Sequence, residues 1–437
     1  MRFLDYCRRL SIGVACAGAL APGVAEGGQS LAGGSLSWTM PETMRPASAV
    51  GLSVYGGAGD SAGVDAAPVD PLLGGPFYTG FIGGLSHRRR GPTYVFSATA
   101  GSSYRYFPES RELLNLESAG VVSLENQVSQ HGRLRLSQAA QHTRFRQIGI
   151  VPGDSADPGT PGDLPTANPE GSATVGQPFY ALTSAVNFSQ SFGPRSSLLL
   201  DYSYQTSLNT EWVVRPETHE ARIRYERRAG RRASVWLGAQ YRMGMTGLVA
   251  DVPDIRANNF EGGLEYTRRG TTIGASSGIV LASRGGVLGT SGDGLGRQIV
   301  AGLAVGQALG QSWRVRADYN RRLQFVQALP DPFVADEANG MVDGQLGRRA
   351  NVTARVGYVT GVATVTTASP DQRIEGWRAS AGFGIVLSRR LRAHAQYNYT
   401  QNRFSQGALD SLPPNVLPRS NWGGVQAGLS VWAPFVH

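Results

Sequence analysis

The feature that most constrains the fold is a regular alternation of apolar and polar side chains over unusually long segments. Four segments show it most clearly: 94–106, 197–208, 377–387 and 391–402. A period of two residues predicts β-strands with one apolar and one polar face. Strands in globular proteins average ~5–6 residues, whereas a strand that crosses a bilayer at a tilt needs ~9–11. The length of these segments therefore favours strands that span a membrane.

Aromatic side chains near the strand ends point the same way. Tyr94 lies near one end of its strand, and Tyr104 and Tyr106 near the other, all on the apolar face. A tyrosine ring is apolar and its hydroxyl seeks water, so the residue suits a membrane–water interface. A soluble sandwich with aromatic residues in its core is the alternative, but it would not need such long apolar faces on nearly every strand.

A helical membrane protein is disfavoured, because the chain has no run of ~18 or more apolar residues. The hydrophobic content is 41% and every basic residue is an arginine, with a formal net charge of +9. No basic helix and no aromatic RNA-binding motif accompanies this charge, so we do not expect nucleic acid as a partner.

The connections between strands alternate in kind. Short turns are rich in arginine, as at 87–91, 227–232, 268–270, 347–349 and 388–392. Long connections are acidic: 146–176 carries Asp154, Asp157, Asp163 and Glu170, and 328–346 carries Asp331, Asp336, Glu337 and Asp343. Short turns at one end and long loops at the other are typical of bacterial outer-membrane barrels, with the turns in the periplasm.

Counting the segments predicts an all-β, antiparallel, up-and-down transmembrane barrel of about 18 strands, with 16 as the alternative. The predicted hairpins are 77–106, 119–145, 177–208, 215–245, 258–283, 297–325, 339–361 and 374–404. Single strands near 48–57 and 422–435 complete the set. The hairpin at 119–145 and the first half of 339–361 are only weakly apolar, which leaves the lower count open. An even number places both ends of the barrel in the periplasm.

The N-terminus has the pattern of a secretory signal peptide over residues 1–25. Arg2, Arg8 and Arg9 precede an apolar core, and small residues precede Glu26. We expect a flexible periplasmic tether at 26–47 and the barrel at 48–437. Cys7 and Cys16 both lie in the predicted signal peptide, and lipidation of Cys16 is disfavoured because no leucine stands in the three residues before it. No disulfide or thiolate metal site is then available to the barrel.

With these features the chain resembles the outer-membrane β-barrel proteins of Gram-negative bacteria, in particular porin-like barrels. In this family the last strand carries an assembly signal of alternating apolar residues ending in an aromatic one. Residues of this chain that fit are Val425, Ala427, Leu429, Val431, Ala433 and Phe435. The chain departs from the pattern at Pro434 and in its last two residues, Val436 and His437. The resemblance implies the outer membrane as the location. It also implies as partners the barrel-assembly machinery, outer-membrane lipids and lipopolysaccharide, and a homo-oligomer as one possible state.

If the apolar faces meet lipid, the polar faces line the lumen. The pore-lining candidates are Arg105, Arg222, Arg224, Arg314, Arg316, Arg355, Arg378, Arg392, Asp201 and Asp318, with Glu226, Glu261 and Glu265 as further acidic residues. A barrel of ~16–18 strands is wide enough for an aqueous channel. The first hypothesis is a porin for passive diffusion of small hydrophilic, possibly anionic, solutes. These charges could equally pair across the lumen and brace its wall.

Two other functions stay open on the sequence. The first is a non-conducting barrel that serves as a structural or export-system component, with its lumen plugged by loops. The second is an outer-membrane hydrolase with His142 or His219 near the outer rim, which is disfavoured because no Ser/His/acid spacing stands out. We expect no enzyme, no cofactor and no metal. The motif Ser291-Gly292-Asp293-Gly294 has too few acidic groups for calcium.

Overall fold

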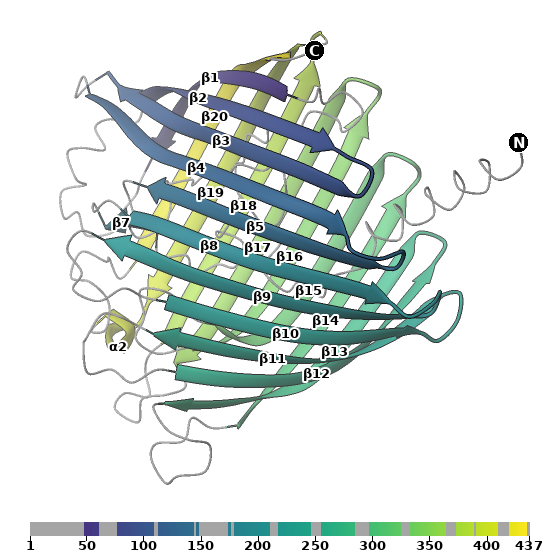
Figure 1. Ribbon diagram of the computed structural model, residues 1–437. Coiled ribbons are helices and arrows are strands. Elements are labelled where there is room, and N and C mark those ends of the chain that lie inside the picture. Colours follow the sequence, from purple (N-terminus) through teal and green to yellow (C-terminus); the bar gives the residue numbers. More distant parts are fainter. Residues whose placement is uncertain are drawn as a thin grey trace, which may run out of the picture.

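A computed structural model shows a closed antiparallel β-barrel of 18 strands, seen from the side in Figure 1. It describes residues 48–60, 77–108, 112–143, 146–147, 174–175, 179–209, 217–245, 255–284, 297–324, 333–363, 373–388, 390–409 and 419–434. The first nine barrel strands are β1 (Ser48–Asp60), β2 (Phe77–Arg90), β3 (Tyr94–Phe107), β4 (Glu112–Gln127), β5 (Gly132–Thr143), β8 (Phe179–Ser191), β9 (Ser196–Asn209), β10 (Glu217–Arg228) and β11 (Ala233–Met245). The other nine are β12 (Ile255–Arg268), β13 (Thr271–Arg284), β14 (Arg297–Leu309), β15 (Trp313–Gln324), β16 (Phe333–Leu346), β17 (Ala350–Ala363), β18 (Arg373–Val386), β19 (Leu391–Phe404) and β20 (Arg419–Pro434).

The barrel closes where its last strand meets its first. β20 pairs with β1 from Ala49↔Pro434 to Asp60↔Gly423, and every other barrel strand pairs with its neighbours in sequence. Because closure leaves no unpaired edge, every barrel strand has a hydrogen-bonded neighbour on both sides. The prediction of an 18-stranded up-and-down barrel is confirmed, and the alternative of 16 strands is excluded.

The short turns all lie at one end of the barrel. The tightest joins β12 to β13 through Arg269 and Gly270, which have φ of 49° and 84°. Positive φ at both central positions gives the twist that suits a two-residue hairpin. The start of β1 lies at this end too, since Ser48 pairs with His87, and so does the end of β20. In Figure 1 these turns lie towards the right-hand side, away from the long connections.

One predicted loop is a strand. Residues 328–346 were expected to form an acidic loop, but 333–346 form β16 and only the shorter connection 325–332 lies before it. The acidic residues sit opposite arginines of β15, in the pairs Arg321↔Asp336 and Arg314↔Asp343. Cross-strand pairs of opposite charge stabilise a sheet. Acidic residues whose sequence pattern predicts a loop are therefore part of a barrel strand.

Several predictions fall largely or wholly on residues outside the described ranges. The signal peptide, the tether, both cysteines and the motif at 291–294 lie there. Most of the predicted loop 146–176 does as well, apart from a short pairing of β6 (Arg146–Gln147) with β7 (Thr174–Val175). A single short helix, α2 (Gln406–Leu409), follows β19 in the described part of the chain.

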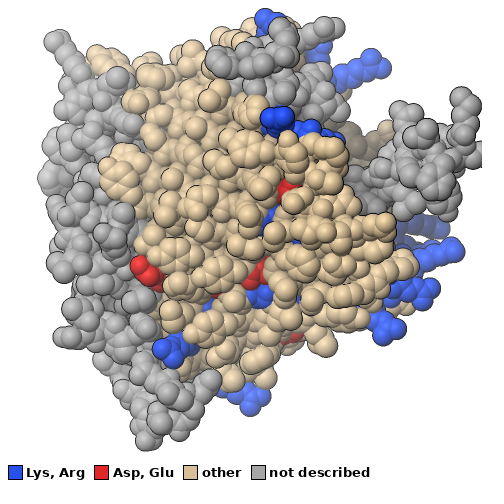
Figure 2. Space-filling model, viewed as in Figure 1, with Lys and Arg blue, Asp and Glu red and all other residues tan. Residues whose placement is uncertain are grey.

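Large apolar side chains alternate to the outside of the barrel. Leu237 is 70% exposed, Ile299 65% and Leu303 51%, and similar residues occur on every barrel strand from β1 to β5 and on most of the others. Figure 2 shows that the outer face of β2–β12 is mostly free of charged side chains, while arginines project where the short turns lie. The polar residues between these apolar ones therefore face inward.

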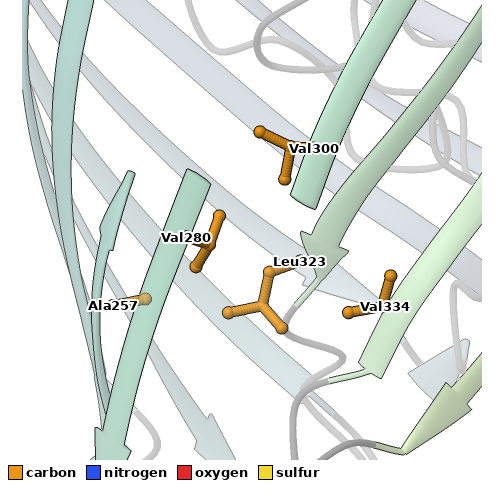
Figure 3. Packing of buried hydrophobic residues seen from close by; sticks show 5 residues of the cluster. All are labelled: Ala257, Val280, Val300, Leu323 and Val334. Carbon is orange, nitrogen blue, oxygen red and sulfur yellow. The ribbon is translucent and has the colours of Figure 1, made fainter. Parts of the chain in front are cut away.

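A small apolar cluster packs near the other end of β12–β16. It consists of Ala257, Val280, Val300, Leu323 and Val334, which lie on five successive strands and approach one another in Figure 3. Phe333, at the start of β16, is fully buried and its ring covers Gly361, where a Cβ atom would lie 2.3 Å from the ring. This cluster fixes the ends of strands whose inner faces carry the charges described next.

Candidate functional site: the inner face of the barrel

One side of the inner face carries charges of both signs. This charge-paired wall is formed by inward residues of β9–β12 and β15–β16: Asp201, Glu220, Arg222, Arg224, Glu226, Arg242, Glu261, Glu265, Arg316, Asp318, Arg322 and Glu337. Carboxylates outnumber arginines in this set. A surplus of arginine is therefore not a property of this part of the lumen.

The tightest contacts of the charge-paired wall are two arginine–glutamate pairs. Arg242 donates from Nε and from one terminal nitrogen to the same oxygen of Glu220, at 2.9 and 2.6 Å. Arg322 donates to both oxygens of Glu337, at 2.9 and 3.1 Å, and Gln324 donates to Glu337 as well. Two charge-assisted hydrogen bonds from one guanidinium group fix the geometry of a pair and are stronger than neutral hydrogen bonds. Both glutamates are thereby held in place.

Further contacts join neighbouring strands into one network. Arg322 also interacts electrostatically with Glu220 and Glu261, although β15 is several strands away from β10 and β12. Asp318 accepts hydrogen bonds from Asn320 and Asn339, at 3.1 and 3.0 Å. The electrostatic network thus extends beyond the pairs between adjacent strands and links β10 and β12 with β15.

Arg224 occupies a distinct place in this wall. Its guanidinium lies 4.4 Å from the centre of the Trp236 ring and 3.6 Å from a carboxylate oxygen of Glu226. Trp236 in turn lies against Gly263, where a Cβ atom would be 2.7 Å from the indole nitrogen. A cation over an aromatic ring is stabilised by the charge distribution of the ring. The glycine provides the space that this stack needs.

The other side of the inner face carries arginine, histidine and amides. This arginine–amide wall consists of Asn351, Arg355, Arg378, Arg392, His394, Gln396, Asn398, Thr400, Asn402, Gln426 and Ser430 on β17–β20, with Ser53 on β1. Among the described residues, the inner faces of β17–β20 carry no carboxylate. β19 and β10 stand half-way round the ring from each other, so the β9–β12 part of the charge-paired wall faces the arginine–amide wall across the barrel, while β16 adjoins β17.

Side-chain contacts along the arginine–amide wall are hydrogen bonds to neutral acceptors. Arg392 donates to Asn351 at 2.7 Å, and Gln396 donates to Asn398 at 2.8 Å. Gly384 leaves room for Arg392, because a Cβ atom there would lie 2.3 Å from its terminal nitrogen. Buried atoms without a hydrogen-bond partner among the described residues include the Nε atoms of Arg355 and Arg392 and Nε2 of His394. Polar hydrogen-bonding capacity therefore remains on this wall.

The predicted pore-lining residues divide between the two walls. Asp201, Arg222, Arg224, Arg316 and Asp318 lie in the charge-paired wall, and Arg355, Arg378 and Arg392 in the arginine–amide wall. Arg314 lies exposed on the inner side near a short turn, opposite Asp343. Arg105 belongs to β3, and its side chain lies outside the described part. Whether these residues line an open pore stays a prediction.

Sequence reasoning missed several members of both walls. Arg242 and Glu220 were not selected, although alternation along 217–245 places both on the polar face. Alternation along 297–325 also places Arg322 on the polar face, but its partner Glu337 falls in the predicted loop 328–346. The histidines expected near the outer rim are found there: His142 lies 4.7 Å from the Tyr180 ring centre, and His219 lies 4.8 Å from that of Tyr204. The described residues contain no group of three metal-ligating side chains.

The barrel resembles solved outer-membrane structures in fold. No family model and no curated protein matches the chain. The FrpB iron transporter of Neisseria meningitidis shows 10% identity and a TM-score of 0.47 over 86% of this chain, which spans 66% of FrpB. The siderophore receptor PirA of Acinetobacter baumannii shows 7% identity and a TM-score of 0.45, over 89% of this chain and 81% of PirA. The ferric yersiniabactin uptake receptor FyuA of Yersinia pestis shows 11% identity and a TM-score of 0.39, over 90% of this chain and 81% of FyuA.

The closed ring with an apolar outer surface decides the location, since lipid solvates such a surface and water does not. The protein is a bacterial outer-membrane β-barrel. Among the described residues, no helix has the length and apolar character that crossing a membrane requires. This location agrees with the prediction from the sequence.

The functional prediction needs correction. The three barrels named above are an iron transporter and two siderophore receptors, and none of them is a porin for passive diffusion. The prediction of a passive porin is therefore contradicted, and the alternative of a structural or export-system barrel gains no support. The expectation that the chain is not an enzyme stays a prediction. At these identities the likeness shows the fold alone, and the ligand must be argued from the inner face.

Proposed function

We propose that this protein is an outer-membrane transport protein that binds an anionic, hydrogen-bonding ligand inside the barrel, at the arginine–amide wall. The observation that carries the proposal is the composition of this wall. Three arginines and a histidine lie on the inner faces of β17–β19, and no carboxylate stands among the described residues of those faces. A ligand with carboxylates would supply acceptors for the buried Nε atoms of Arg355 and Arg392, which have no hydrogen-bond partner among the described residues.

The position of the cations also supports a specific ligand. Arg378 is 7% exposed, and Arg392 is fixed by Asn351 and by the space above Gly384. Arginines that are already held in place lose little rotamer freedom when a carboxylate binds. Asn398 and Asn402 flank Thr400, the register partner of Arg378, and Gln426 is the register partner of Gln396. These amides can donate to or accept from hydroxyl groups.

The test measures ligand binding by the folded barrel in detergent micelles. We use citrate as the anionic probe and maltotriose as a neutral, hydroxyl-rich probe, with isothermal titration calorimetry as the readout. Citrate should bind more tightly than maltotriose. The double variant Arg355→Gln/Arg392→Gln should weaken citrate binding by about a hundredfold, because each charge-assisted hydrogen bond contributes about 1.5 kcal/mol.

A matched control removes the same charge elsewhere. Arg231→Gln/Arg348→Gln changes two exposed arginines at the short turns and should leave citrate binding unchanged. Equal loss in both double variants, or equal binding of the two probes, would overturn the proposed binding site. Uptake of labelled citrate into proteoliposomes tests transport, and binding without uptake would overturn that part of the proposal.

A further inference from the structure

The part of the arginine–amide wall that a ligand can reach is shorter than the wall itself. Towards the outer end, Arg378, Asn398, Thr400 and Asn402 are less than a tenth exposed. Nearer the short turns, the wall residues of β17 and β19 are only half-buried. This reachable stretch consists of Asn351, Thr353 and Arg355 on β17 and of Arg392, His394 and Gln396 on β19. A ligand of the wall should therefore lie along these two strands.

The two arginines of the reachable stretch stand at different levels along the barrel. Arg392 donates to Asn351, and its terminal nitrogen lies over Gly384. Because Gly384 is the register partner of both Asn351 and His394, these residues mark the level of the Arg392 guanidinium. Arg355 follows four residues further along β17, which corresponds to roughly 14 Å in an antiparallel strand. An elongated ligand with separated negative charges fits this spacing better than a compact anion.

Between these two levels the reachable stretch is neutral. Thr353 of β17 and Gln396 of β19 are both register partners of Gly382, so only a glycine separates them on β18. A hydroxyl group and a side-chain amide can each donate to and accept from the hydroxyl groups of a ligand. This level therefore offers hydrogen bonds to the uncharged middle of an elongated ligand.

The hydrogen bonds within the wall engage its acceptors more than its donors. The side-chain oxygens of Asn351, Gln396 and Asn398 each accept from a neighbouring side chain. The Nε atoms of Arg355 and Arg392 have no partner among the described residues, and an arginine is a donor only. A ligand rich in oxygen acceptors matches this stretch, whereas a peptide would bring backbone N–H groups that need acceptors of their own.

We propose that the ligand of the arginine–amide wall is an acidic oligosaccharide that lies along β17 and β19. The inference rests on the proposed function and narrows its ligand from an anion in general to a chain of sugar units that bear carboxylates. One carboxylate accepts from Arg392 and a second from Arg355. The hydroxyls of the sugar unit between them exchange hydrogen bonds with Thr353 and Gln396. The saccharide thus supplies both the separated charges and the neutral hydroxyls that the reachable stretch matches.

The test compares trigalacturonate with galacturonate, maltotriose and tri-glutamate in calorimetric titrations of the folded barrel in detergent micelles. Trigalacturonate should bind at least tenfold more tightly than galacturonate, because only the trimer reaches both arginines. Maltotriose has the length without the charge, and tri-glutamate has the charge without the hydroxyls. Both should bind at least tenfold more weakly than trigalacturonate. Equal affinity of trigalacturonate and any one of these three probes would overturn the proposal.

A pair of matched variants tests the neutral level. Thr353→Val/Gln396→Leu should weaken trigalacturonate binding about tenfold, because it removes the hydrogen bonds to the middle sugar unit. The control Thr183→Val/Gln205→Leu makes the same substitutions at register partners on the inner faces of β8 and β9 and should leave the affinity unchanged. Equal weakening in the two variants would contradict the placement of the ligand. Heat-modifiable migration on gels verifies that each variant is folded.

Citrate, titrated in parallel, separates this inference from the proposed function. If citrate does not bind, the proposed anion site is itself wrong. If citrate binds and trigalacturonate binds no more tightly than galacturonate, only the assignment to an oligosaccharide is wrong.

Discussion

At the scale of single residues, burial separates the ion pairs that fix the wall from those that do not. Glu337 is 2% exposed and is held by two hydrogen bonds from Arg322. Arg133 and Glu125 lie 3.9 Å apart beside a short turn, with side chains 58% and 45% exposed. Exposed pairs contribute little because water and salt screen them, whereas a buried pair leaves an unmatched charge when one partner is removed.

A double-mutant cycle tests this difference. For Arg322→Met and Glu337→Met, we expect a coupling free energy of about 2 kcal/mol, as for hydrogen bonds between charged groups. For Arg133→Met and Glu125→Met it should stay below about 0.5 kcal/mol. Urea unfolding from lipid vesicles, followed by tryptophan fluorescence, gives the free energies. Additive effects at the first pair would show that its geometry contributes nothing to stability.

At the scale of elements, the strands were predictable wherever one face is continuously apolar. Residues 391–402 alternate so regularly that β19 was expected within two residues of its observed ends. β16 was recognised only in part, because its outer face is interrupted by Asp336, Gly340 and Gly344. Its stability as a strand depends on partners in β15 that only the register reveals. Alternation likewise predicts that Arg222 and Arg378 lie on the polar face. It does not show which residues they contact, because the strand register is not visible in the sequence.

The alternation makes a depth-dependent prediction within one strand. Leu303 lies at the middle of β14 and faces outward, 51% exposed, and Leu309 ends the same strand, 52% exposed. Leu303→Arg should lower the free energy of unfolding by about 2–4 kcal/mol, and Leu309→Arg by about 1 kcal/mol or less, because an arginine costs most at the bilayer midplane. Unfolding titrations in vesicles measure both. An equal cost at the two positions would contradict the assignment of this face to lipid.

At the scale of the whole molecule, the fold depends on one pairing between the two ends of the barrel. Ser53 of β1 and Ser430 of β20 are register partners on the inner face, and their hydroxyl oxygens lie 3.0 Å apart. No pairing between strands adjacent in the sequence tests closure, because each would form equally well in an open sheet. A covalent bond between β1 and β20, the seam of the barrel, reports on closure directly.

We expect Ser53→Cys/Ser430→Cys to form a disulfide on mild oxidation of the folded protein, because directly opposed strand residues have Cβ atoms ~4.5–5.5 Å apart, close to the separation that a disulfide needs. The bond joins residues 377 apart in sequence, so the heat-denatured, unreduced chain should be circular and migrate differently from the reduced one. The matched control is Ser97→Cys/Ser123→Cys, a register pair of β3 and β4 whose oxygens lie 2.7 Å apart. Its disulfide closes a loop of only 26 residues and should change migration much less. A seam that stays reduced while the control oxidises would mean that β1 and β20 do not meet, and that the sheet does not close into a barrel.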